Sequence, residues 1–124
     1  MAKYECVIPG SYGFEETLRY FHDHLSSSSF TASFEDGSDY RSGNLRVATR
    51  VYERYTLLGE NRLSMTVTLA SAGDEIFASA ITAAGGGGLV KVWGWGENSY
   101  LEHFIEAAKQ FEGMRPVKTF SPFD

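Results

Sequence analysis

The sequence predicts an α+β protein, a two-layer sandwich in which two helices cover one face of an antiparallel meander of five to six strands. Residues 45–69 form two runs of alternating apolar and polar side chains, the pattern of strands with one covered face. Residues 14–25 and 101–111 carry apolar residues at intervals of three or four, which is typical of amphipathic helices. Turn-forming residues separate these segments and favour an antiparallel sheet.

The N-terminal part of the chain predicts one strand followed by one helix. Residues 3–8 alternate, with Tyr4, Cys6 and Ile8 on one side, and Pro9-Gly10 ends the run. The apolar residues that follow have helical spacing, and Ser11 or Gly13 can serve as the N-cap. The apolar stripe of this helix consists of Phe14, Leu18, Phe21 and Leu25.

From residue 30 the periodicity changes to that of a strand. Phe30, Ala32 and Phe34 alternate with polar residues, and the segment Asp36-Gly37-Ser38-Asp39 that follows has the composition of a turn. We therefore expect a hairpin that turns at residues 36–39.

The pairing of the next two strands decides which side chains face the helices. Both apolar faces consist of odd-numbered residues: Leu45, Val47, Thr49, Val51, Tyr55 and Leu57 in one strand, and Leu63, Met65, Val67 and Leu69 in the other. Directly opposite side chains share a face, so this pairing requires an odd-numbered loop, and Gly59-Glu60-Asn61 fits. Tyr55 is then expected opposite Met65, and Arg54 opposite Thr66.

The C-terminal half leaves two alternatives open. A two-residue Gly73-Asp74 loop places Ala78 and Ala80 in the core and turns Phe77 and Ile81 outward, whereas a longer loop does the reverse. Residues 89–95 alternate and predict a last strand. A helix then begins at Asn98 or Ser99, with an apolar face formed by Leu101, Phe104, Ile105, Ala108 and Phe111.

These elements predict one domain over residues 1–113 and a tail, residues 114–124, that is either docked or disordered. The expected order is β-α-β-β-β-β-(β)-α, which resembles the TBP-like and helix-grip topologies. In larger helix-grip proteins the sheet encloses a ligand cavity against a long final helix. The final helix here is short, so we expect any cavity to be small.

Composition excludes several classes of function. The chain has 124 residues and a formal net charge of −5, which argues against a nucleic-acid partner. No apolar run is long enough for a membrane span, and the first ten residues lack a secretory signal. Cys6 is the only cysteine and falls in an alternating run, so we expect a buried thiol rather than a nucleophile. These features favour a cytoplasmic protein.

Four segments carry a resemblance to known sequences, namely Met-Ala-Lys-Tyr-Glu at residues 1–5, residues 32–40, Val51-Tyr52-Glu53-Arg54-Tyr55 and Asn61-Arg62. They resemble a family of small bacterial proteins of unknown function. The similarity extends to about residue 110 and is most specific between Phe34 and Tyr40. It implies a bacterial cytoplasmic protein and transfers no catalytic residue.

No metal or cofactor site is expected. His22 and His24 are two positions apart on a helix, about 200° around its axis, so they cannot share an ion. His103 has no cysteine or carboxylate at ligand spacing that would support a site. The acidic residues between 35 and 39 lack the ligand series of a calcium loop, and the glycines at 85–88 lead into a strand instead of a phosphate-binding helix.

Two groups of residues are candidate binding surfaces. Arg46, Arg50, Tyr52, Arg54 and Arg62 are expected on the outer sheet face, either as a salt-bridged surface or as a partner interface. Glu53 is expected on the apolar face, opposite Val67, where a carboxylate needs a partner. With Tyr55, Trp93 and Trp95 it could line a small pocket between the sheet and the helices, although closing the end of the core is the more ordinary role for the two tryptophans.

The leading hypothesis is a non-enzymatic module that binds a partner, most plausibly a second copy of itself as a homodimer, through the sheet face or edge. The alternative is a protein that binds a small apolar or acidic ligand in that pocket. An enzyme is the third option, because the sequence contains no recognisable nucleophile–base pair or pair of catalytic carboxylates.

Overall fold

The computed structural model describes residues 1–29, 31–55, 62–85 and 95–118, and for residues 85 and 95–97 it describes the backbone alone. The elements are β1 (Ala2–Pro9), η1 (Gly10–Tyr12), α1 (Phe14–Ser26), β2 (Ser33–Ser42), β3 (Leu45–Tyr55), β4 (Arg62–Ser71), β5 (Glu75–Gly85), α3 (Trp95–Ala108) and β6 (Arg115–Pro116). The strands form one antiparallel sheet in the order β2-β3-β4-β5-β1-β6. This confirms the predicted α+β class.

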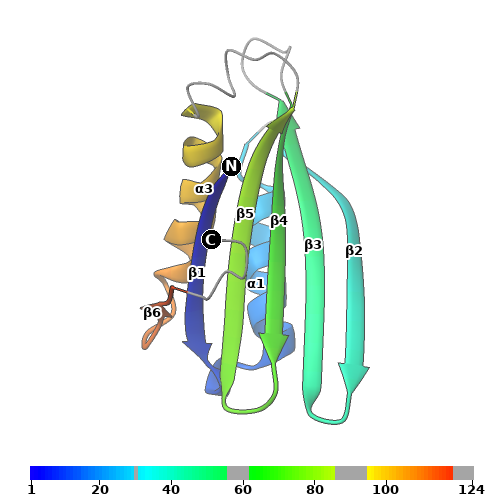
Figure 1. Ribbon diagram of the computed structural model, residues 1–124, viewed down its shortest axis with the longest axis vertical. Coiled ribbons are helices and arrows are strands. Elements are labelled where there is room, and N and C mark those ends of the chain that lie inside the picture. Colours follow the sequence, from blue (N-terminus) through cyan, green and yellow to red (C-terminus); the bar gives the residue numbers. More distant parts are fainter. Residues whose placement is uncertain (30, 56–61, 86–94, 119–124) are drawn as a thin grey trace.

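Both helices cover the same face of the sheet, so the molecule has two layers. Figure 1 views the opposite face, which neither helix covers and which is called the open face below, with α1 and α3 behind the strands. Helix α3 packs on β5 and β1, and α1 packs against α3 and β3. No helix in the part of the chain that the structure describes is long and apolar enough to span a membrane.

The predicted apolar stripes lie in the core. Cys6 and Ile8 of β1 are fully buried. In the helices, Phe21, Leu25, Phe104 and Ala108 are buried and Phe14, Leu18, Ile105 and Phe111 pack around them. Helix α1 begins directly after Gly13, one of the two expected N-cap residues, whose φ of 87° suits glycine.

The predicted turn at Asp36-Gly37-Ser38-Asp39 is wrong, because β2 continues through these residues. The chain turns instead at Gly43-Asn44, between Ser42 and Leu45, which face each other. Gly43 has a φ of 56°, the left-handed conformation that two-residue hairpins require. The polar segment at 36–39 is an exposed edge strand with a bulge between Phe34 and Asp36.

The predicted register of β3 on β4 is also wrong. Tyr55 lies opposite Arg62, Arg54 opposite Leu63 and Glu53 opposite Ser64, each three residues away from the expected partner on β4. A shift by an odd number exchanges the two faces of a strand. Even-numbered residues of β3 therefore face the helices, and Val47 and Val51 lie on the open face. The loop predicted at Gly59-Glu60-Asn61 lies outside the described residues.

The register of β4 on β5 resolves the alternative at Gly73-Asp74. Ser71 lies opposite Ile76, the pairing expected for a two-residue loop. Ala78 and Ala80 are accordingly buried, whereas Ile81 is 39% exposed on the open face.

The end of the chain differs from the predicted pattern in two places. Helix α3 begins at Trp95, where the last strand was expected to end, and the rest of that strand lies outside the described residues. In the predicted tail, Arg115 and Pro116 pair with β1, and the amide of Val117 donates to the carbonyl of Glu5 at 3.0 Å.

Cys6 is a structural residue with a protected thiol. Its side chain is fully buried, and burial raises its pKa to about 11. Thiolate is the reactive species, so both effects suppress reaction. At pH 8 we expect DTNB to modify the native thiol at least about 1000-fold more slowly than the urea-unfolded one, because reaction requires opening of the core. A native rate near the unfolded rate would show that Cys6 is accessible.

Candidate functional site

Three of the arginines predicted on the outer face line the helix-covered face and are held by contacts there. Arg46 donates to Glu15 of α1 at 2.8 Å and lies over the ring of Phe14. Arg50 pairs with Asp39 of β2 at 3.1 Å. These ion pairs neutralise much of the basic surface that the sequence suggested, as expected for the salt-bridged alternative.

Arg54 reaches from the same face of β3 to α3. Its guanidinium lies 4.6 Å from the ring centroid of Tyr100, donates to Ser99 at 3.4 Å and is 3.4 Å from Nε2 of His103. Burial, opposed by Tyr100, lowers the pKa of Arg54, and burial followed by the charge of Arg54 lowers that of His103. Arg54 is therefore a link between the two layers.

Tyr52, between these arginines, is buried and bonded to the first helix. Its hydroxyl lies 2.9 Å from Nδ1 of His22, and burial raises its pKa to about 12. The hydroxyl is thus part of the interior and is not available to a partner on the sheet face.

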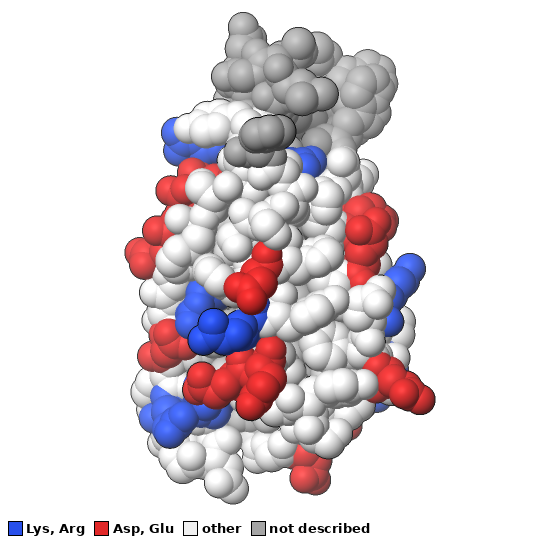
Figure 2. Space-filling model, turned by 180° about the vertical axis from the view of Figure 1, so that it is seen from behind, with Lys and Arg blue, Asp and Glu red and all other residues white. Residues whose placement is uncertain are grey.

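An open groove of about 550 Å³ separates α1 from the edge of the sheet at β2 and β3. Its lining includes Arg19 and Arg50, and also three carboxylates, those of Glu15, Asp36 and Asp39. Figure 2 views this side of the molecule, where positive and negative side chains lie interspersed. The mixed charge gives the groove no selectivity for an acidic ligand.

The pocket predicted around Glu53 does not lie between the layers. Glu53 and Tyr55 are on the open sheet face, where Arg62 lies 3.6 Å from the Glu53 carboxylate and 5.7 Å from the Tyr55 ring. Trp93 lies outside the described residues, and only the backbone of Trp95 is described. Ligand binding by these four residues stays a prediction, but Glu53 is a surface ion-pair partner and not an isolated core carboxylate.

Among the described residues, the open sheet face has an uncharged centre. Its side chains are Val47, Thr49, Val51, Thr66, Thr68, Ala70, Phe77 and Ile81, and Ser79 on the same face is buried. Charged residues surround this centre as pairs, namely Lys3–Glu5, Glu53–Arg62 and Glu75–Arg115. Tyr40, Leu45 and Tyr55 add apolar surface, with 60%, 39% and 47% of their side chains exposed.

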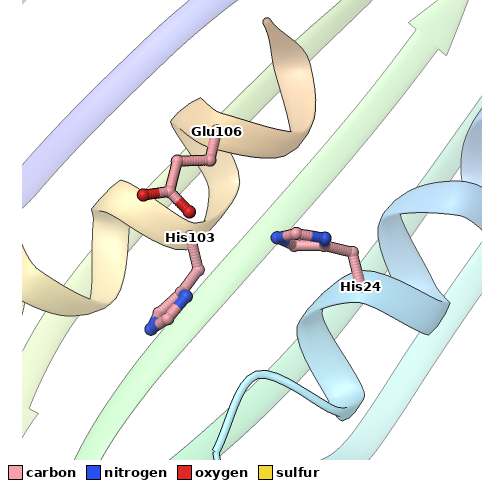
Figure 3. A group of neighbouring side chains, drawn as sticks. All are labelled: His24, His103 and Glu106. Atoms are coloured by element: carbon pink, nitrogen blue, oxygen red, sulfur yellow. The ribbon is translucent and has the colours of Figure 1, made fainter. Parts of the chain in front are cut away.

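A cluster of His24, His103 and Glu106 forms where the helices meet. Each offers one nitrogen or oxygen atom, and these atoms lie within 4.8 Å of one another. Figure 3 shows the ring of His24 extending from α1 toward the two side chains of α3. His22 points elsewhere, to Tyr52, so the two histidines of α1 are separated as predicted.

The comparisons with known proteins identify a family. Residues 1–112 match DUF6054, a family of unknown function. The chain belongs to this family. No curated protein and no solved structure matches it.

In this DUF6054 protein, sequence inspection missed the three-residue cluster for a specific reason. The expectation that no carboxylate accompanies His103 is wrong, because Glu106 follows it by one helical turn. That spacing was visible in the sequence. The position of His24 was not, because it depends on how α1 packs against α3.

Proposed function

We propose that this protein is a non-enzymatic binding module that pairs with a second copy of itself through the open face of its sheet. The single observation that carries the proposal is the uncharged centre of that face. Single exposed apolar residues are ordinary on protein surfaces, but a contiguous apolar and hydroxyl-bearing face on a protein of net charge −5 favours an interface.

The distribution of charge favours a second copy as the occupant. In a two-fold contact a surface meets itself, so unpaired charges at its centre would face equal charges. Here the described centre is neutral, and Lys3, Glu5, Glu53, Arg62, Glu75 and Arg115 at its rim are already paired within the chain, with Asp36 as an exception. Asp36 is at the edge of the sheet, where its carboxylate accepts a hydrogen bond from the amide of Gly37 at 2.7 Å.

The shape of the face supports the same occupant. Short and β-branched side chains of β3, β4 and β5 form a broad pleated surface, and two such surfaces interdigitate when sheets pack face to face. The resulting dimer has four layers, with the helices and the ion pairs of Arg46 and Arg50 on the outside.

The exposed edge strand β2 is a weaker candidate for self-association. Pairing along an edge is opposed by charged residues and bulges. Strand β2 has both, with Glu35, Asp36, Asp39 and Arg41 along it and a bulge after Phe34. The described residues at the centre of the open sheet face include no charge and no bulge.

The test is the mass of the tag-free protein in solution. We expect light scattering and native mass spectrometry to give twice the chain mass of 13.8 kDa. Ile81→Glu should shift the protein to monomer and weaken association at least about 100-fold, because association would remove a carboxylate in each copy from water. Lys3 of β1 lies opposite Ile81, so the new carboxylate has a neighbouring cation and should not destabilise the monomer itself.

Gln110→Glu is the matched control, because it adds the same charge on an exposed residue after α3, away from the open face. It should leave the dimer intact. A monomeric wild type at the highest attainable concentration would refute the proposal, and so would a dimer that Ile81→Glu does not weaken. We also propose a bacterial cytoplasmic location, which the resemblance to small bacterial proteins and the single buried thiol support.

A further inference from the structure

The contact between the two helices contains three metal-ligating side chains with few other partners. His103 and Glu106 are one turn apart on α3, and His24 approaches from the last turn of α1. The two histidines are half-buried and Glu106 is exposed. The cluster is therefore reachable from solvent while two of its three side chains are held by packing.

The ring nitrogens of His24 and the carboxylate of Glu106 make no hydrogen bond or ion pair with the residues that the structure describes. The His24 ring is held by stacking on Tyr20, at 6.2 Å between centroids and 21° between planes. Stacking fixes the plane of the ring and leaves the nitrogens at its edge free to bind. In Figure 3 that edge points toward α3.

Two imidazoles and one carboxylate suit a particular class of ion. Nitrogen donors favour Zn²⁺ and similar transition-metal ions over Ca²⁺ and Mg²⁺, which take oxygen ligands. Bond lengths near 2 Å place two ligand atoms about 3.3 Å apart around a tetrahedral ion. The present separations, up to 4.8 Å, close to that value by modest side-chain rotations.

Arg54 works against metal binding in two ways. Its positive charge repels a cation. Arginine can only donate, so its 3.4 Å contact uses Nε2 of His103 as the acceptor, and an ion at Nδ1 requires the ring proton to move to Nε2 and this contact to be given up. Arg54 is also held over Tyr100, away from Glu106. The balance indicates a site of moderate affinity.

We propose that His24, His103 and Glu106 bind one zinc-like divalent transition-metal ion that links α1 to α3. Three protein ligands leave a fourth tetrahedral position for water or another donor. The site is on the helix-covered side, remote from the open sheet face, so the metal and dimer proposals stand or fall separately.

The test uses tag-free protein that has been stripped of metal with a chelator. Calorimetric titration with ZnCl₂ should show that one ion binds per chain. Titration with CoCl₂ should give the visible absorption of four-coordinate Co²⁺. We expect His24→Ala, His103→Ala and Glu106→Gln each to weaken binding at least about 100-fold, the upper end of the loss seen for outer-shell partners alone.

Two control variants separate ligation from general charge and histidine effects. Glu102→Gln makes the same change as Glu106→Gln at an exposed position of α3, and His22→Gln removes the histidine that points to Tyr52. Both should bind zinc as the wild type does. Zinc should also raise the melting temperature of the wild type but not of Glu106→Gln. Because Glu106 is exposed, its replacement should leave the fold intact, so a missing shift would reflect lost zinc binding and not misfolding. Undetectable zinc binding, or equal binding by the three ligand variants, would overturn the proposal.

Discussion

Replacing Phe104 with alanine is expected to destabilise the protein by about 3–5 kcal/mol, the usual range for deleting a buried aromatic ring. Phe104 is fully buried in α3 and joins both helices to the sheet. Its ring stacks on Phe21 of α1 at 4.7 Å and meets the edge of Tyr4 of β1 at 6.3 Å. Removing the ring leaves a cavity where three elements converge.

Phe34→Ala is the matched control, because it deletes the same group from a side chain that is 45% exposed. Phe34 contacts His22 and Tyr52 only at the border of the core, so its loss should cost about 1 kcal/mol. The measurement is urea unfolding at one fixed protein concentration, since association would add to the apparent stability. Equal costs for the two variants would contradict the packing role given to Phe104.

The elements with a single apolar face were predictable from sequence. In α1, α3, β1 and β4 the apolar residues have one clear period, and these residues form the buried core. A single covered face leaves only one way to pack each element, so the periodicity alone determines its orientation.

Strand β3 shows where periodicity fails. Val47 and Val51 have the character of core residues and lie on the open face, whereas Arg46, Arg50 and Arg54 face the helices. Arginine tolerates this position because its long apolar stem packs on aromatic rings while the guanidinium finds a partner. Here Phe14 and Tyr100 supply the rings. Both faces of β3 therefore carry apolar and polar groups, and the hydrophobicity pattern does not indicate which face packs against the helices.

The positions of the candidate sites depend on which face of β3 packs against the helices, and on packing between elements that are distant in sequence. The register error placed Arg46, Arg50 and Arg54 on the open face and Glu53 on the helix-covered face, whereas the structure has the reverse. In β5, the small residues Ala78 and Ala80 indicate the helix-covered face correctly, because small side chains allow a helix to approach closely. The metal cluster needed the spatial relation of α1 and α3, which no local pattern contains.

Gly10→Ala is expected to destabilise the protein by about 1–3 kcal/mol, the cost of forcing extra volume into a packed site. A Cβ at Gly10 would lie 2.5 Å from the carbonyl oxygen of Asp74 and 2.8 Å from that of Gly73. The amide of Gly10 donates to the same Asp74 carbonyl at 2.7 Å, so neither backbone can withdraw without losing this bond. Pro9-Gly10 marked the end of a strand in the sequence; the close approach explains why glycine occupies the position.

Variants of Gly43 provide the comparison, because the two glycines are required for different reasons. At Gly43 a Cβ would meet nothing within 4 Å, but the φ of 56° penalises alanine. Asparagine tolerates that conformation, so Gly43→Asn should be more stable than Gly43→Ala. At Gly10 we expect the opposite order, with Gly10→Ala more stable than Gly10→Asn, because the larger asparagine side chain overlaps more with the backbone of Asp74. Thermal unfolding of the four variants tests this reversal, and asparagine being favoured at both positions would show that backbone conformation, not contact with Asp74, selects Gly10.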